Sequence, residues 1–175
     1  MSETLPIPRR RVLGALLATQ WAAGGLLAAA PAQGAPAAPA LGGRLGLVDL
    51  PLIEGGTFRA AQAERQVVVV YWWASWCPFC AEMSPSVEKL WQAHRDRGLT
   101  VLGISIDRGI DAPREYRRRR GYTFPSALYQ PAIEHALPKP NIVPVLWVRD
   151  RGGRLVLAER GQMFPEDVEQ IARFL

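Results

Sequence analysis

The sequence predicts an α/β domain built on a central mixed β-sheet, with helices on both faces and an antiparallel hairpin at the C-terminal edge. The apolar run over residues 67–73 lacks polar alternation, which is typical of a strand buried on both faces. Helical and strand patterns then alternate along the chain, as they do where strands are joined by long crossovers. The turn signal Arg151-Gly152-Gly153 precedes the last strand and indicates the hairpin.

The elements are predicted from apolar periodicity in chain order. After the strand over residues 67–73, Pro78 suits the first turn of a helix, and apolar residues recur at helical spacing until Gly98. The remaining elements are a strand over 99–106, a helix over 112–120, a short strand over 124–129, strands over 145–148 and 155–158, and an amphipathic helix over 165–175. One domain, residues 41–175, accommodates them all.

The composition is that of an ordinary globular protein. Of the 175 residues, 49% are apolar and 21% are charged, so the chain is too apolar and too weakly charged to be disordered. Its two cysteines allow one intrachain bridge, which excludes a mini-protein held together by disulfides. A structural zinc site would need both cysteines and both histidines to converge. We therefore expect the cysteines to take part in a chemical reaction rather than to hold the fold together.

Residues 1–40 are interpreted as an export signal and its exit. Arg9–Arg11 form a basic region, residues 12–30 are apolar, and Ala-x-Ala triplets suited to cleavage follow. The order Arg-Arg-x-apolar-Leu resembles a twin-arginine signal, although Pro8 stands where Ser or Thr is usual. A single membrane anchor is the alternative. The sequence therefore predicts an exported, periplasmic protein.

The charge pattern gives no reason to expect a nucleic-acid partner. Residues 1–40 hold three Arg and one Glu, so the rest of the chain has 18 basic and 15 acidic residues, a net charge of +3. Arg114 and the run Arg117–Arg120 end a helical segment that Gly121 closes, where basic residues suit the helix dipole. We interpret this run as a solvated helix face, with a docking patch for an acidic partner as the alternative.

The strongest chemical signal is Cys77-Pro78-Phe79-Cys80, at the junction of a buried strand and a helix. Residues three apart on a helix lie about 5–6 Å apart, the Cα separation that a disulfide needs. Cys77 would lie at the open N-terminal end, where free N–H groups and the helix dipole stabilise a thiolate. Cys77 is therefore the predicted nucleophile, and Cys80, one turn further in, is the predicted resolving thiol.

Two other uses of these cysteines stay open at this point. A permanent structural bridge is one, although so short a loop removes little entropy from the unfolded chain. Copper(I) held by the two thiolates is the other. No zinc site is predicted, because His94 and His135 lack matching spacing. His94 is expected at a helix end, and His135 at the surface or in packing.

The same region resembles the thioredoxin superfamily, and within it the exported TlpA/ResA-like thiol-disulfide oxidoreductases. The stretch Val69–Cys80 is similar to the family's strand followed by aromatic-Trp-Ala-x-Trp-Cys-x-x-Cys, and Pro85 matches the proline that kinks the active-site helix. Ile142–Val145 is similar to the cis-proline segment that enters the next strand. The resemblance covers residues 45–175 and implies a thioredoxin fold.

The resemblance also implies roles for residues around the two cysteines. Pro144 would be cis and face the disulfide, with Val143 lending its backbone to hold substrate peptide. From its own position, directly before Cys77, Trp76 is expected to cover the disulfide and contact substrate, with Pro78 and Phe79 beside it. The implied enzyme exchanges thiols and disulfides with no cofactor beyond the redox-active pair. Its partners would be oxidised or reduced protein substrates, such as apocytochromes, and a dithiol electron donor, soluble or membrane-bound.

Two departures from the family pattern leave the proton relay open. Tyr71 stands six residues before the first cysteine, where thioredoxins carry a buried Asp. Met83 stands where ResA-like reductases often carry a Glu, and Glu82 lies one position earlier. Glu82 would lie about 100° around the helix from that position. We therefore consider it both as a proton relay and as a solvated Glu near the helix N-terminus.

The direction of electron flow is predicted from the dipeptide between the cysteines. Pro78-Phe79 carries no charge, so the helix end alone would stabilise the thiolate. A strongly oxidising pair needs further stabilisation of its reduced form. We therefore predict a reductase of protein disulfides, with cytochrome c maturation as one setting, and keep an oxidase or isomerase of the same fold as the alternative.

Overall fold

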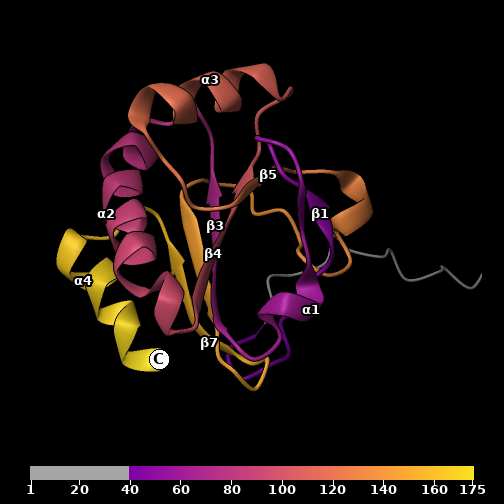
Figure 1. Ribbon diagram of the computed structural model, residues 1–175, viewed down its shortest axis with the longest axis vertical. Coiled ribbons are helices and arrows are strands. Elements are labelled where there is room, and N and C mark those ends of the chain that lie inside the picture. The colour runs from indigo at the N-terminus through magenta and orange to yellow at the C-terminus, as the bar shows by residue number, and fades with distance from the viewer. Residues whose placement is uncertain (1–39) are drawn as a thin grey trace, which may run out of the picture. The chain divides into compact units, whose positions relative to one another are not determined.

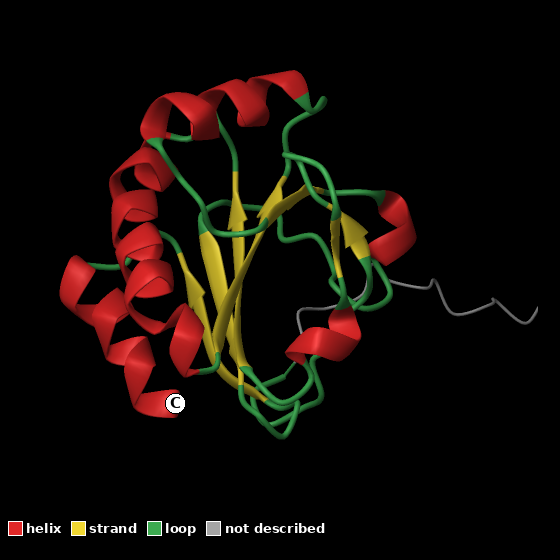
Figure 2. Cartoon of the chain, viewed as in Figure 1, coloured by secondary structure: helices red, strands yellow, loops and turns green. Residues whose placement is uncertain are grey.

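The structure, a computed structural model, describes residues 40–175, so the export signal predicted for residues 1–40 lies outside the described residues except for Ala40. A five-stranded mixed sheet runs through this part of the chain in the order β5-β4-β3-β6-β7 (Figure 1, Figure 2). Its strands are β3 (Val67–Trp73), β4 (Leu99–Ser105), β5 (Ser126–Leu128), β6 (Val145–Arg149) and β7 (Leu155–Arg160). β3, β4 and β5 are parallel, whereas β6 and β7 are each antiparallel to their neighbours.

The central strand β3 builds a core on each face of the sheet. Every side chain in it is at most 1% exposed, as the unbroken apolar run predicted. Successive side chains of a strand point to opposite faces, so Val69, Tyr71 and Trp73 belong to one core, and Val68, Val70 and Trp72 belong to the other.

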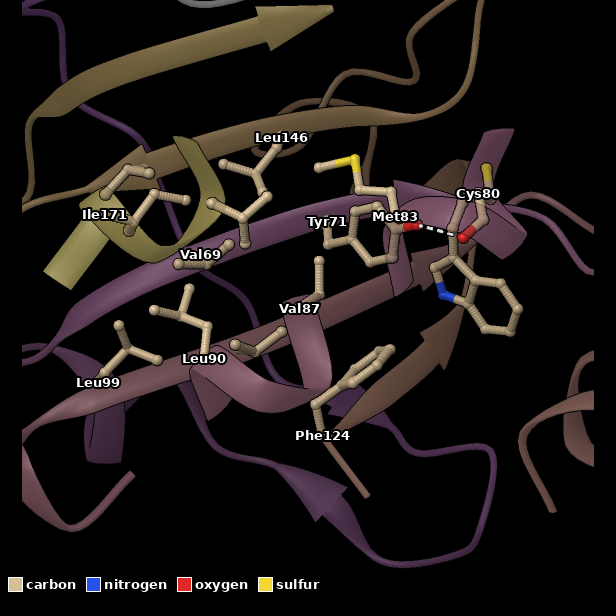
Figure 3. Close-up of a cluster of buried hydrophobic side chains, with 14 of the residues drawn as sticks. Val69, Tyr71, Cys80, Met83, Val87, Leu90, Leu99, Phe124, Leu146 and Ile171 are labelled. Carbon is tan, nitrogen blue, oxygen red and sulfur yellow. Dashed lines mark hydrogen bonds between the residues drawn. The ribbon is translucent and has the colours of Figure 1, made fainter. Parts of the chain in front are cut away.

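Helices α2 (Pro78–His94) and α4 (Pro165–Glu169) cover the first of these faces (Figure 1). On α2, the buried Met83, Val87 and Leu90 recur at spacings of four and three residues, which places them on one side of the helix, against β3 (Figure 3). No helix in the described part of the chain is both long and apolar enough to cross a membrane.

The second face is covered by the segments that precede β3 and β6. The first segment holds β1 (Leu50–Pro51), β2 (Thr57–Phe58) and α1 (Ala60–Ala63), and the second holds a 3-10 helix (Pro131–Ile133). β1 and α1 lie on the side of the sheet away from α2 and α4 in Figure 1. These elements were not predicted, because two- to four-residue elements are too short to show a period.

Helix α3 (Asp111–Arg120) corrects the interpretation of its arginine run as a solvated face. Arg117 is only 2% exposed. It forms an ion pair with Glu54, and its guanidinium donates to the carbonyl of Phe124 at 2.6 Å. Arg117 follows the buried Pro113 by four residues, so both lie on the inward face of the helix. The other three arginines of the run are exposed.

The C-terminal segment also differs from its prediction as one continuous helix over 165–175. α4 ends at Glu169, and Gln170–Phe174 form a 3-10 helix. Val168, Ile171 and Phe174 recur every three residues, and a 3-10 helix places residues three apart on one side, here toward the core. The predicted mixed sheet, the helices on both faces and the C-terminal hairpin are confirmed.

Candidate active site

The two cysteines lie where β3 ends and α2 begins. A disulfide joins Cys77 to Cys80, and their Cα atoms are 5.2 Å apart, as the helical spacing predicted. Cys77 is the N-cap residue of α2 and has an extended backbone (φ −86°, ψ 115°). Pro78 occupies the first helical position, where the N–H that proline lacks would have no partner within the helix. The local sequence therefore starts the helix at the first cysteine.

The N-terminal end of α2 stabilises negative charge on the sulfur of Cys77. The backbone N–H of Cys80 donates to Cys77 Sγ, with an N···S distance of 3.1 Å. In the reduced protein this N–H and the dipole of the 17-residue helix both favour a thiolate at Cys77. Cys80 is the more deeply buried residue, at 1% exposed against 4%. The geometry thus separates an anion-stabilising position from a shielded one.

The segment before β6 faces the disulfide. The Val143–Pro144 peptide bond is cis, as the family resemblance implied. The carbonyl oxygen of Val143 lies 3.7 Å from Cys77 Sγ. Strand register explains this contact, because Trp72 near the end of β3 pairs with Val145 at the start of β6. Residues just before Val145 therefore lie beside those that follow β3.

Exposed apolar side chains flank both segments. Trp76 is 66% exposed and Phe79 is 57% exposed, and Ile142, two residues before Pro144, is 42% exposed. Pro78 is exposed as well. Apolar side chains this accessible are typical of binding surfaces when they gather in one region. The structure thus brings the predicted substrate-contacting residues to one region, and their roles stay a prediction.

Behind Cys80, buried hydroxyl groups occupy the place where thioredoxins carry a carboxylate. Ser84 Oγ donates to the carbonyl oxygen of Cys80 at 2.7 Å. The hydroxyl of Tyr71 lies 3.0 Å from Ser84 Oγ. It also donates to the carbonyl oxygen of Cys80 at 3.4 Å (Figure 3). Burial raises the pKa of Tyr71 well above its ordinary range, so its phenol stays protonated at neutral pH. These groups hold the backbone of Cys80 and supply no anionic base.

Glu82, considered as a proton relay, is exposed on α2. The side-chain amide of Gln162 donates to its carboxylate at 2.7 Å. Met83, at the position where ResA-like reductases often carry a Glu, is 1% exposed and belongs to the core. The surroundings of Glu82 are those of a solvated carboxylate, and its relay role stays a prediction.

Asp107 ties the end of β4 to the segment that enters the redox pair. Its carboxylate accepts hydrogen bonds from the backbone N–H of Ser75 at 3.0 Å, from Ser75 Oγ at 2.7 Å and from Ser105 Oγ at 2.7 Å. Ser75 lies two residues before Cys77, so the carboxylate of Asp107, a residue only 9% exposed, fixes the segment that leads to Cys77.

The sequence did not predict the contact between Asp107 and Ser75, which lie 32 positions apart. One signal was available. Both residues follow neighbouring parallel strands, and the carboxyl ends of parallel strands meet at one edge of a sheet, where functional groups gather.

The donor atoms at the site are two sulfurs. Within residues 40–175, no group of three or more His, Cys, Asp or Glu side chains could hold a metal ion. His94 is the last residue of α2, and its Nδ1 lies 3.2 Å from an Arg97 nitrogen. His135 is exposed. Both histidines thus occupy the kinds of position that the sequence predicted.

Comparison with known proteins places this geometry among redox proteins. The AhpC/TSA family matches residues 42–129 of this chain. A similar curated protein is the thiol-disulfide oxidoreductase ResA of Geobacillus kaustophilus, which is 22% identical over 120 residues, 67% of this chain and 68% of the relative. ResA of Bacillus anthracis is 20% identical over 117 residues, with the same coverage.

Solved structures share the fold. A thiol:disulfide interchange protein of the thioredoxin family from Chlorobium tepidum has a TM-score of 0.68 and 21% identity, covering 79% of this chain and 97% of its own. A protein of Bacteroides thetaiotaomicron, described as a putative protein disulfide isomerase, has a TM-score of 0.70 and 23% identity, covering 78% and 91%. These likenesses show the thioredoxin fold that the sequence predicted.

Proposed function

This chain belongs to the AhpC/TSA family and is a thiol-disulfide oxidoreductase of the thioredoxin fold, and we propose that it reduces protein disulfides in the periplasm through Cys77 and Cys80. The observation that carries the proposal is the placement of Cys77 Sγ at the N-cap of α2, 3.1 Å from the N–H of Cys80. That placement favours a thiolate at one cysteine and leaves the other shielded one turn away.

The exchange needs no atoms beyond the two sulfurs of the protein. The Cys77 thiolate attacks one sulfur of a substrate disulfide, and the substrate S–S bond breaks as a Cys77–substrate disulfide forms. The departing substrate sulfur takes up a proton. The Cys80 thiol then loses its proton and attacks Cys77 Sγ, which breaks the mixed disulfide; the second substrate sulfur leaves as a thiolate and takes up a proton in place of the one that Cys80 lost. Two electrons have passed from the protein to the substrate, and the Cys77–Cys80 disulfide remains.

The surroundings of the disulfide support a polypeptide as the substrate. Trp76 and Phe79 offer exposed apolar surface on one side of Cys77. On the other side, Val143 presents backbone groups to an extended peptide, beside Pro144. A dithiol protein, soluble or membrane-bound, would return the two electrons. Apocytochromes are one class of substrate that fits, because their cysteines must be reduced before haem attachment.

The reduction potential of the Cys77–Cys80 pair tests the direction of flow. The dipeptide Pro78-Phe79 adds no charge to the stabilisation that the helix end provides, so we expect a potential near that of a reductant, about −270 mV for thioredoxin, and far from about −120 mV for a strong oxidase. The pair is equilibrated with glutathione or dithiothreitol buffers, and the oxidised fraction is read by mass spectrometry after alkylation.

A potential above roughly −170 mV, with fast oxidation of a reduced peptide, would make the protein a donor of disulfides instead. Replacing Cys80 by serine provides the control, because that variant has no internal disulfide to titrate. The 150 mV between the two reference values corresponds to about 7 kcal/mol, far larger than the error of the measurement.

Periplasmic location rests on residues 1–40. If the twin-arginine route is used, replacing Arg9 and Arg10 by lysine blocks export, because that route reads the guanidinium pair. Undiminished export of the variant would point to the general secretory route. Mass spectrometry of the mature N-terminus separates cleavage near residues 32–40 from an intact anchor.

A further inference from the structure

A cavity of about 220 Å³ lies between the loop over residues 138–141 and the strands β6 and β7. Its floor is apolar and its rim is polar. The floor is formed by Val145, Trp147 and Ala158, and the rim includes Lys139, Asn141 and Arg160. Trp147 is only 2% exposed, whereas Lys139 and Arg160 are exposed. An apolar floor with a few polar groups at its edge is the usual form of a binding site.

The cavity lies at the same end of the sheet as the redox pair. Val145 directly follows Pro144, and the carbonyl of Val143 lies 3.7 Å from Cys77 Sγ. Arg160 pairs with Val145 in the β6–β7 register, and the N–H of Gly161 donates to the carbonyl of Pro144 at 2.9 Å. An extended peptide advances about 3.3–3.6 Å per residue. Val145 is two residues from Val143, at most about 7 Å along the backbone. A substrate residue two to four positions from the attacked cysteine spans this separation.

The charged groups at the rim are both cationic. The guanidinium of Arg160 donates to Asn141 Oδ1 at 2.7 Å, which orients it without neutralising it. The ammonium of Lys139 lies 5.4 Å from the centre of the Tyr129 ring. Within residues 40–175, neither cation forms an ion pair. The nearby carboxylate of Glu134 accepts from the Tyr129 hydroxyl and from the backbone N–H of Lys139, and it does not line the cavity.

We propose that this cavity binds an acidic residue of the protein substrate, two to four positions from the cysteine that Cys77 attacks, and so selects substrates by sequence. The proposal rests on the proposed function and adds a specificity determinant to it. The carboxylate forms ion pairs with Arg160 and Lys139, while the aliphatic part of the same residue lies against Ala158, the half-buried residue of the floor. Its floor belongs to the core on the face of the sheet opposite α2, and neither Trp76 nor Phe79 lines it.

Matched peptides test the proposal. Each carries one cysteine, joined by a disulfide to 2-mercaptoethanol, with either Glu or Gln two to four positions away. The reduced full chain is compared with the double variant Lys139→Gln/Arg160→Gln. The control is Lys89→Gln/Arg173→Gln, which makes the same change in net charge at exposed positions on the other face. Each peptide is reduced in a single turnover, and its second-order rate constant is divided by that for the neutral hydroxyethyl disulfide, which is too small to span the two sites.

The wild-type chain and the control variant should prefer the Glu peptide by about threefold to tenfold, as expected for one or two exposed ion pairs. The double variant should lose this preference, and added salt should weaken it in the wild type. Equal second-order rate constants for the two peptides in the wild type, or a preference that survives in the double variant, overturn the proposal. If the wild type fails to reduce hydroxyethyl disulfide at all, the proposed function fails and this proposal falls with it.

Discussion

Replacing Asp107 by alanine tests whether one carboxylate organises the approach to the redox pair. The carboxylate accepts three hydrogen bonds, two from Ser75 and one from Ser105. A hydrogen bond to a charged group contributes about 1.5–3 kcal/mol, and the lower value applies here because Ser75 is partly exposed. Three such bonds give an expected loss of about 3–5 kcal/mol in the free energy of unfolding.

Asparagine at position 107 provides an internal comparison. Its carboxamide oxygen can accept from the Ser75 N–H and from Ser105 Oγ, while its amide donates to Ser75 Oγ. All three contacts are then kept without the charge, and the expected loss falls to about 1–2 kcal/mol. Asp96→Ala is the matched control, because the Asp96 side chain is 92% exposed and should contribute less than about 0.5 kcal/mol.

Urea unfolding of the oxidised protein measures these differences. The midpoints can be compared if the free energy of unfolding depends on urea concentration with the same slope in every variant. The exchange rate with hydroxyethyl disulfide should follow the same order, because Ser75 lies two residues before Cys77. An Asp107→Ala variant as stable as the Asp96→Ala control would show that the Asp107 carboxylate does not hold this segment. An asparagine variant as unstable as the alanine one would show that its hydrogen bonds do not account for the stability.

Two further predictions concern packing and pH. In Gly103→Ala the new Cβ would lie 2.7 Å from Ser126 Oγ and 2.8 Å from the Phe124 ring. This overpacking should lower the free energy of unfolding by about 1–3 kcal/mol, seen as a lower urea midpoint. An unchanged midpoint would show that the site accommodates the methyl group. Burial alone would raise the pKa of Glu88, but hydrogen bonds from the Thr123 hydroxyl, Gln92 and two backbone N–H groups outweigh it and hold the pKa below its usual range. Stability from Glu88 is therefore present above the unfolded-state pKa of about 4.3 and is lost as the pH falls through the lower folded-state pKa. In the Glu88→Gln variant the urea midpoint should therefore fall less steeply as the pH is lowered. An equally steep fall in the variant would show that Glu88 is not the group responsible.

The parts of the fold that could be predicted are those that local residue patterns determine. The strand Val67–Trp73 was predicted to the residue, because a strand buried on both faces is apolar throughout. Cys77 and Pro78 mark the start of α2 for reasons that involve only the first helical turn. The Cys77–Cys80 separation is a property of helix geometry, so it needed no tertiary information.

The parts that could not be predicted depend on contacts between distant segments. Arg117 looked solvated because its neighbours in sequence are arginines, and its burial depends on Glu54 and Phe124. A signal existed in its spacing of four from Pro113, which places both on one helix face. The cavity beside β6 required the register of β6 and β7, which brings Arg160 to Val145. That register is set by packing and by the geometry of the turn, so it cannot be predicted from composition.

The pH dependence of alkylation of the reduced protein shows directly which of the two cysteines is the nucleophile. Reduced protein is treated with limiting iodoacetamide from pH 5 to 10, and mass spectrometry assigns the label to Cys77 or Cys80. A hydrogen bond to an anion, worth about 1.5–3 kcal/mol, raises the acid dissociation constant of the thiol by about tenfold to a hundredfold. Cys77 should therefore react first, with a pKa below that of an ordinary thiol, and Cys80 should lag. Faster labelling of Cys80, or a pKa for Cys77 at or above the ordinary thiol value, would contradict the account.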